Sequence, residues 1–127
     1  MSFNSEYEPF FQPPGWLVRP VWIILYTALI ISISLVYSRR EDIEKYGFIV
    51  TVFLAQILLN LAWPTVFNSE QYLISLVMIG AMVALSSVYI YLTWKQLPEA
   101  SKLMLPYIAW VTFAGFINAA YYIKFRT

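Results

Sequence analysis

The stretch QILLNLAWPTVF, residues 56–67, lies inside a long segment that has no charged side chain. Residues three or four positions apart stack on one side of a helix, so two amides and two large aromatic rings share a face here: Gln56, Asn60, Trp63 and Phe67. Amide groups are costly to expose to lipid. This face therefore predicts a helix that packs against other helices or lines a ligand site.

The composition around this stretch is that of an integral membrane protein. Of the 127 residues, 61% are hydrophobic and 12% are charged, and the mean hydropathy is +0.66, whereas soluble proteins have about 25% charged residues. A bilayer core is spanned by about 20 helical residues, and four uncharged runs reach that length: 20–38, 46–69, 71–94 and 103–123. These continuous runs lack the alternating polarity of barrel strands. The sequence therefore predicts an all-α membrane bundle of four transmembrane helices.

We expect a single transmembrane domain, 1–127, with helices over about 14–38, 46–67, 72–94 and 102–124. Proline lacks an amide hydrogen and its ring clashes with the preceding turn. Pro20 therefore predicts a kink or an irregular first turn, and Pro64 predicts a local break just past Trp63. Gly80 and Ala84 are small residues one turn apart, a spacing that lets another helix approach closely.

The distribution of charge predicts an orientation. Residues 39–45, RREDIEK, hold six of the fifteen charged side chains and form a solvated loop. Five basic residues lie in the first and third loops, against three on the opposite side of the bundle. By the positive-inside rule the two loops lie in the cytoplasm and both termini lie outside.

The side chains that are present argue against most enzyme and metal chemistry. The formal net charge of +1 argues against a nucleic-acid partner. Cysteine and histidine are absent, which removes zinc sites and the commonest haem ligand. Every Asp and Glu lies in a tail or loop, which disfavours proton-coupled antiport, and no nucleophile with a base and no glycine-rich phosphate loop is present. We therefore predict no catalytic residues and no metal site.

The side chains that remain as candidates for function are aromatic. Trp16 and Trp94 lie at the ends of predicted spans, which is typical of anchors at the membrane interface. Trp22 and Trp110 lie deeper in their spans, and each is compatible either with an anchor at the membrane interface or with the wall of a ligand pocket. The face of the last helix that carries Trp110 also carries Tyr107, Ala114, Asn118 and Tyr121.

Three motifs occur in order along the chain: EPFFQPPGWLVRPVWIILY, AQILLNLAWPTVF and LMLPYIAWVTFAGFINAAYY. They resemble the TspO/MBR family of tryptophan-rich sensory and translocator proteins, over about residues 9–122. The resemblance implies a membrane bundle of five helices, commonly dimeric, that encloses a pocket for porphyrins and synthetic ligands, with cholesterol binding in the animal proteins. Only residues 1–12 precede the PPGW motif, where the family has its first helix. We therefore expect a shortened member with four helices and one open pocket wall.

The resemblance also implies roles for individual residues. Trp22 and Trp110 match aromatic pocket positions linked in bacterial members to porphyrin binding and breakdown. Asn60 matches a pocket-lining amide, and Ala114 matches a small position whose replacement alters ligand binding in the animal protein. With the neighbours that share their helix faces, the predicted ligand-binding residues are Trp22, Tyr26, Asn60, Trp63, Tyr107, Trp110, Ala114 and Arg19.

Structural interpretations stand beside these roles. Asn60 and Gln56 are also expected to form hydrogen bonds between helices. Ala114 with Gly115 is also typical of close helix packing. Arg19 is expected either to bind a porphyrin propionate through its planar guanidinium or to extend its charged head to the lipid headgroups.

Two functions follow from this sequence. The first is a membrane receptor or sensor that requires no cofactor and binds protoporphyrin IX, and also sterols, in an aromatic pocket. A metal-free porphyrin is favoured because no axial iron ligand is available, and photodegradation of the porphyrin is a variant of this function. The second is a structural or regulatory subunit that docks another membrane protein through its open pocket wall. We expect the lipid bilayer and a homodimer or other membrane protein as partners, in a bacterial rather than a mitochondrial membrane.

Overall fold

The computed structural model of the chain describes residues 15–125. This part of the chain is entirely helices and turns, and it has four helices long and apolar enough to cross a membrane: α1 (Gly15–Ser38), α2 (Tyr46–Asn68), α3 (Tyr72–Thr93) and α4 (Pro98–Phe125). The predicted all-α membrane bundle is therefore confirmed. The predicted start of the first helix, at about residue 14, and residues 1–12 before it lie outside the described residues.

Helix α4 begins earlier than the hydropathy pattern predicts. It starts at Pro98 rather than near Lys102, so the third loop is shorter than expected. Proline suits the first turn of a helix because the amide hydrogens there have no partner within the helix. Glu99 in that turn complements the positive end of the helix dipole. Glu99 and Lys102 keep the apolar run from beginning before residue 103, but the helix itself already begins at Pro98.

The helices continue through their prolines. Pro20, Pro64 and Pro106 all lie inside unbroken helices, and α2 runs on to Asn68. The predicted break at Pro64 is therefore wrong. Proline is tolerated inside membrane helices where neighbouring groups satisfy the backbone that it frees.

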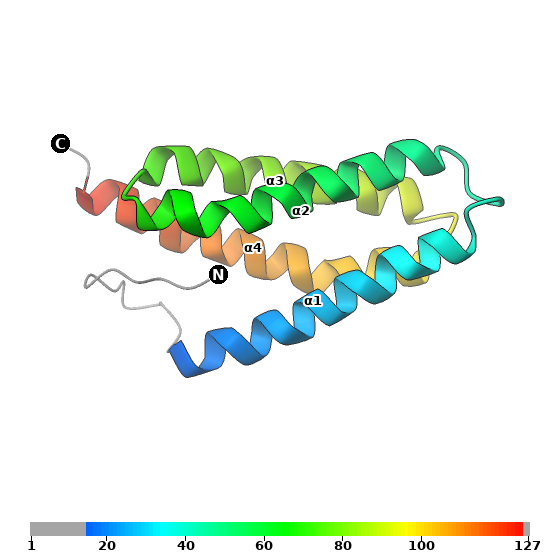
Figure 1. Cartoon of the computed structure of the whole chain (residues 1–127), viewed down its shortest axis with the longest axis horizontal. Coiled ribbons are helices and arrows are strands. Elements are labelled where there is room, and N and C mark those ends of the chain that lie inside the picture. The colour runs from blue at the N-terminus through cyan, green and yellow to red at the C-terminus, as the bar shows by residue number, and fades with distance from the viewer. Residues whose placement is uncertain (1–14, 126–127) are drawn as a thin grey trace.

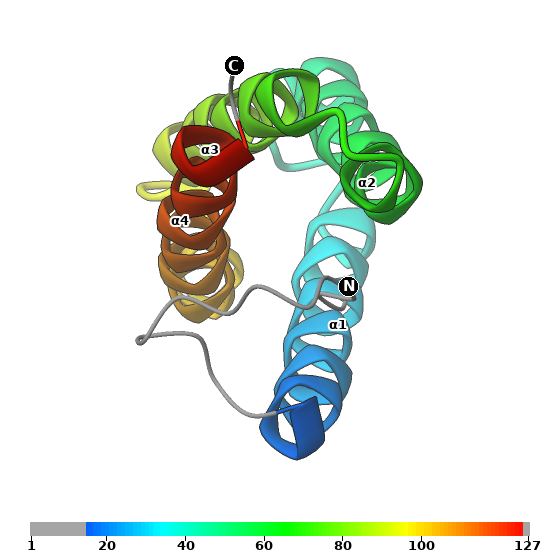
Figure 2. The same cartoon turned by 90° about the vertical axis from the view of Figure 1, so that its left-hand side faces the viewer.

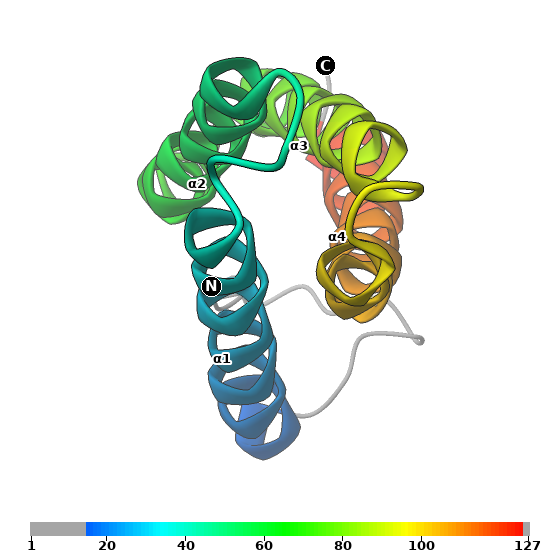
Figure 3. The same cartoon turned by 90° about the vertical axis from the view of Figure 1, so that its right-hand side faces the viewer.

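The helices are arranged as an arc with one oblique member. Helices α2, α3 and α4 pack in chain order, whereas α1 packs chiefly on α4 and touches α2 only slightly. Viewed end-on, α1 crosses the others at an angle, and its N-terminal end lies away from them (Figures 2 and 3). The α1–α2 and α3–α4 loops lie together at one end of the bundle, which we call the loop end (Figure 1).

The buried faces follow the predicted helical spacing, with one exception. The four residues of the predicted α2 face are each at most 1% exposed: Gln56, Asn60, Trp63 and Phe67. The close approach of α3 and α4 occurs at Gly115, where a Cβ atom would lie 3.1 Å from Ile79 Cγ2. Gly80 and Ala84 are instead exposed, and no described atom lies within 4 Å of a Cβ built on Gly80. The predicted close approach at Gly80 and Ala84 is therefore wrong for helices of this chain.

A buried hydroxyl group ties α1 to the bundle near the loop end. Ser32 Oγ donates to the carbonyl oxygen of Ala100 at 2.8 Å and shares a second hydrogen bond of 2.8 Å with Tyr89 Oη. Ser32 and Tyr89 are both fully buried. This one side chain of α1 therefore contacts both α3 and the first turn of α4.

Candidate functional site

Four aromatic rings meet between α1 and α4, and we call them the aromatic cluster: Trp22, Tyr26, Tyr107 and Trp110. The Trp22 ring, 5% exposed, lies with its centroid 5.3 Å from Tyr26. It meets Tyr107 and Trp110 nearly edge-on, each at 6.3 Å and at 76° and 85° respectively. Edge-to-face contacts are favoured by the charge distribution of aromatic rings. The cluster therefore fixes the orientation of Trp110, which is only half-buried.

A chain of hydrogen bonds runs behind these rings and joins three helices. Tyr26 Oη donates to Asn60 Oδ1, Asn60 Nδ2 donates to Tyr107 Oη at 3.1 Å, and Tyr107 Oη donates to Gln56 Oε1 at 2.5 Å. We call these four residues the amide–hydroxyl chain. Its last atom, Gln56 Nε2, is buried and has no hydrogen-bond partner among the described residues. A buried donor therefore remains available beside Tyr107.

A second group without a partner lies at the same level of the bundle. The rings of Phe53 on α2 and Tyr89 on α3 are 5.4 Å apart, and α2 and α3 are antiparallel. Gln56 follows Phe53 by about one turn on α2, and Ser86 precedes Tyr89 by about one turn on α3, so both lie on the same side of this ring pair. Ser86 Oγ is buried and also has no hydrogen-bond partner in the described part of the chain. Such groups are rare in folded proteins, so this level of the bundle has spare hydrogen-bonding capacity.

Trp63 takes part in a different polar contact, nearer the α2–α3 turn. Its ring stacks on Phe67 at 4.7 Å and 20°, and its Nε1 donates to Asn118 Oδ1 at 3.1 Å. Asn118 Nδ2 in turn donates to the carbonyl oxygen of Tyr72 at 2.9 Å. These contacts join α2, α3 and α4, so Trp63 has a clear packing role in addition to the predicted ligand role.

The predicted site residues thus separate into groups. The structure brings five of them together: Trp22, Tyr26, Asn60, Tyr107 and Trp110. Ala114 is buried one turn beyond Trp110, beside the tightly packed Gly115, and Arg19 is exposed on α1. Gln56, absent from the predicted ligand-binding set, carries the donor that has no partner in the described part of the chain. Its spacing of four residues from Asn60 is the sequence signal that points to it.

An apolar groove between α1 and α4 adjoins the aromatic cluster. Its volume is about 470 Å³, within the range of about 300–1,000 Å³ that is usual for ligand sites. It is lined by Val21, Ile24, Leu25, Pro106, Ala109, Trp110 and Phe113. Trp110 belongs to both the groove and the aromatic cluster. A ligand in this groove would therefore contact Trp110, a ring that also packs against Trp22 and Phe113.

Among the described residues, the aromatic cluster and the amide–hydroxyl chain contain no carboxylate, histidine or lysine. Their polar groups are amides and phenols, and residues 15–125 contain no cluster of three or more potential metal ligands. Amides and phenols can orient a ligand, and indoles can stack on it. The arrangement is therefore chemically suited to binding a ligand.

Comparison with known proteins agrees with this architecture. The TspO/MBR family model matches residues 2–123. The chain is 34% identical to a tryptophan-rich protein TspO of Archaeoglobus fulgidus, covering 91% of this chain and 74% of the relative. It is 30% identical to the translocator protein of Bos taurus, covering 91% and 70%, and 27% identical to protein CrtK of Rhodobacter capsulatus, covering 91% and 73%. The chain is therefore a multi-pass integral membrane protein that belongs to the TspO/MBR family.

Proposed function

We propose that this protein is a membrane receptor or sensor that binds a planar tetrapyrrole, such as metal-free protoporphyrin IX, between α1 and α4. The observation that carries the proposal is Trp110, which lines the apolar groove and is held edge-on by Trp22. A porphyrin has a broad apolar face, and stacking on an indole is the interaction that such a face makes best.

The amide–hydroxyl chain supplies polar contacts for the edge of the ligand. Tyr26 is only half-buried, and rotation of its ring would free Asn60 Oδ1 to accept a hydrogen bond from a pyrrole N–H. Gln56 Nε2 adds a donor that has no partner among residues 15–125. Arg19, one turn before Trp22, lies exposed where a propionate would reach the membrane surface.

The names of the relatives support a role in recognition and signalling or transport. These relatives are named translocator protein and tryptophan-rich protein TspO. A sterol would fit the apolar walls of the groove but would make little use of the amides. We therefore assign the tetrapyrrole as the principal ligand and the sterol as a competitor for the same groove.

The test is a titration of the detergent-solubilised protein with protoporphyrin IX. Binding is followed both by tryptophan quenching and by the fluorescence of the porphyrin itself, because replacing a tryptophan also removes a reporter. We expect saturable binding that weakens in Trp110→Phe, by at most about tenfold, because phenylalanine keeps an aromatic ring and an aromatic pair contributes up to about 1.5 kcal/mol. Asn60→Ala should weaken binding as well.

Trp94→Phe is the matched control, because Trp94 lies at the end of α3 and lines neither the α1–α4 groove nor the aromatic cluster. It should bind protoporphyrin IX as the wild type does. Equal weakening in Trp94→Phe and Trp110→Phe would contradict the assigned site. No saturable binding in the wild type would overturn the receptor role and favour the docking of another membrane protein.

A further inference from the structure

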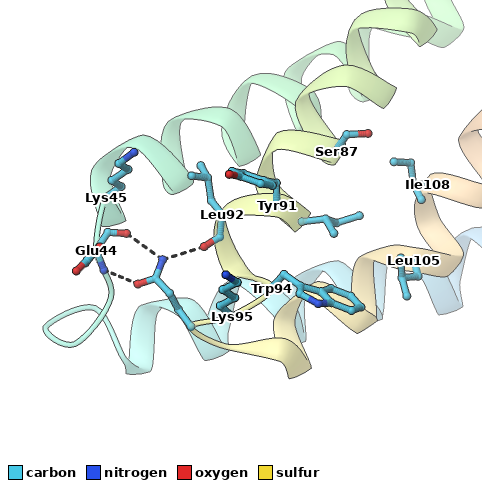
Figure 4. Close-up of a pocket in the computed structure, with 11 residues that line it drawn as sticks. Glu44, Lys45, Ser87, Tyr91, Leu92, Trp94, Lys95, Leu105 and Ile108 are labelled. Carbon is cyan, nitrogen blue, oxygen red and sulfur yellow. Dashed lines mark hydrogen bonds between the residues drawn. The ribbon is translucent and has the colours of Figure 1, made fainter.

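A second groove lies between α3 and α4 at the loop end of the bundle, apart from the aromatic cluster. Its volume is about 700 Å³. Its walls change in character along its length. Ionisable side chains of Glu44, Lys45 and Lys95 lie at the loop end, and aliphatic side chains of Leu105 and Ile108 lie toward the middle of α4 (Figure 4). The groove is therefore polar at one end and apolar at the other.

The aromatic residues of the groove mark the boundary between these two ends. Trp94 lies between Lys95 and Leu105 (Figure 4), at the end of the α3 span, where tryptophan prefers the headgroup region of a bilayer. Tyr91 is 81% exposed and Trp94 is 47% exposed. In a membrane these exposed surfaces face lipid. An occupant of the groove would therefore come from the bilayer, with its polar head level with Trp94 and its chain below.

The two lysines are held at the same rim by a specific contact between loops. The side chain of Gln96 accepts a hydrogen bond from Glu44 N at 2.6 Å and donates to the carbonyl oxygens of Leu92 and Glu44 at 2.8 and 3.3 Å. This contact fastens the α1–α2 loop onto the end of α3. Figure 4 shows Lys45 beside Glu44 on the α1–α2 loop side and Lys95 beside Trp94 at the end of α3.

The backbone of Lys45 is in an unusual conformation. It has φ 62° and ψ 32°, the left-handed region, at the residue before α2. Lysine adopts this region rarely, and residues held in it cluster at functional sites. A glycine or asparagine would take the same backbone at lower cost. The choice of lysine at this position therefore favours a functional role for its ammonium group.

The charges at this rim are unbalanced. Among the described residues neither Lys45 nor Lys95 forms a salt bridge, and Glu44 is the single carboxylate in the lining. Two ammonium groups against one carboxylate leave a charge of +1. A lipid phosphate diester carries one negative charge and would neutralise it, and basic pockets between membrane helices bind anionic headgroups for this reason.

We propose that this groove binds an anionic phospholipid, with its phosphate between Lys45 and Lys95 and one acyl chain along α3 and α4 past Ser87 and Ile108. The predicted orientation of the chain places the loop end in the cytoplasmic leaflet, which holds most anionic lipid. The site is independent of the proposed porphyrin site, since the two grooves share no residue.

The test uses the full chain in phosphatidylcholine vesicles that contain a minor fraction of either brominated phosphatidylglycerol or brominated phosphatidylcholine. Bromine on the acyl chain quenches a nearby tryptophan. The Trp94 signal is obtained as the difference between the wild type and Trp94→Phe. We expect brominated phosphatidylglycerol to quench Trp94 more than brominated phosphatidylcholine at the same fraction, with about a fivefold preference for each lysine engaged.

Lys45→Gln with Lys95→Gln should bring quenching by the two lipids to the same level. The matched control is Arg39→Gln with Lys102→Gln, which removes two exposed cations from the same end of the bundle without changing the groove lining. It should retain the preference for phosphatidylglycerol. Loss of the preference in both double variants would overturn the proposal, because a general surface attraction would then explain it.

Ser87→Phe tests the apolar half of the groove. Ser87 is exposed, and its hydroxyl bonds only within α3, to the carbonyl oxygen of Val83 at 2.8 Å. The substitution therefore fills the groove without breaking a contact between helices, and it should reduce the excess quenching by phosphatidylglycerol. Equal quenching of wild-type Trp94 by both lipids would overturn the proposal. Quenching by neither lipid would also overturn it and would indicate that another copy of the chain covers the groove.

Discussion

Tyr107 is the residue on which the amide–hydroxyl chain depends most. Its hydroxyl accepts from Asn60 and donates to Gln56, so Tyr107→Phe leaves two buried amide groups without their partner. Gln56→Met removes one of these bonds but also removes a nitrogen that has no partner among the described residues. Leaving a buried polar group unpaired costs about 1–3 kcal/mol.

We therefore predict that Tyr107→Phe lowers the free energy of unfolding by at least about 1 kcal/mol, and that Gln56→Met lowers it by less. Denaturation in mixed micelles, followed by circular dichroism, measures both variants against the wild type. A larger loss in Gln56→Met would contradict this order and would mean that Gln56 Nε2 has a partner in the folded protein.

Helix α1 depends on few polar contacts, and Ser32 makes two of them. Ser32→Ala removes the hydrogen bonds to Tyr89 and to the carbonyl oxygen of Ala100. Hydrogen bonds between membrane helices contribute about 0.6 kcal/mol on average and up to about 1.7 kcal/mol. We predict that Ser32→Ala lowers the unfolding free energy by about 1 kcal/mol and increases proteolysis of the α1–α2 loop.

The control for this element is Ser34→Ala. Ser34 lies two positions later on α1 and is exposed, so its replacement removes no buried contact. Its unfolding free energy should stay within about 0.5 kcal/mol of the wild type, as for other surface substitutions. The same loss in both variants would contradict the role of the buried hydroxyl, and helix propensity could not explain that loss because alanine favours the helix more than serine does.

The whole molecule is a three-helix arc with α1 attached to it chiefly through α4. Because α1 touches α2 only slightly, we predict that its distance from α2 varies more than the distance between α2 and α3. The chain has no cysteine, so spin labels can be introduced at exposed positions, Ile23 with Leu58 for α1 and α2, and Leu58 with Val77 for α2 and α3.

Distance distributions from pulsed electron paramagnetic resonance should be broader for the first pair. If the proposed porphyrin site is correct, protoporphyrin IX should narrow the first distribution and leave the second unchanged, because the ligand lies against α1 and α4. Equal widths without ligand would contradict the loose attachment of α1, whatever the outcome of the binding titration.

The sequence by itself determined the membrane class, the four spans and the buried face of α2, because hydrophobic length and helical period are local properties of the chain. Helical spacing also placed Trp22 with Tyr26 and Tyr107 with Trp110 on shared faces, while the family resemblance singled out Trp22, Asn60 and Trp110 as pocket residues, and their ligand role stays a prediction. The sequence misjudged Pro64 and the start of α4, where neighbouring groups and the helix dipole outweigh hydropathy. Only the tertiary structure decided that Trp63 bonds to Asn118, that Gln56 Nε2 has no partner among residues 15–125, and that Gly80 faces outward. These facts depend on how far each helix is rotated about its axis relative to helices distant in sequence, and no local pattern specifies that rotation.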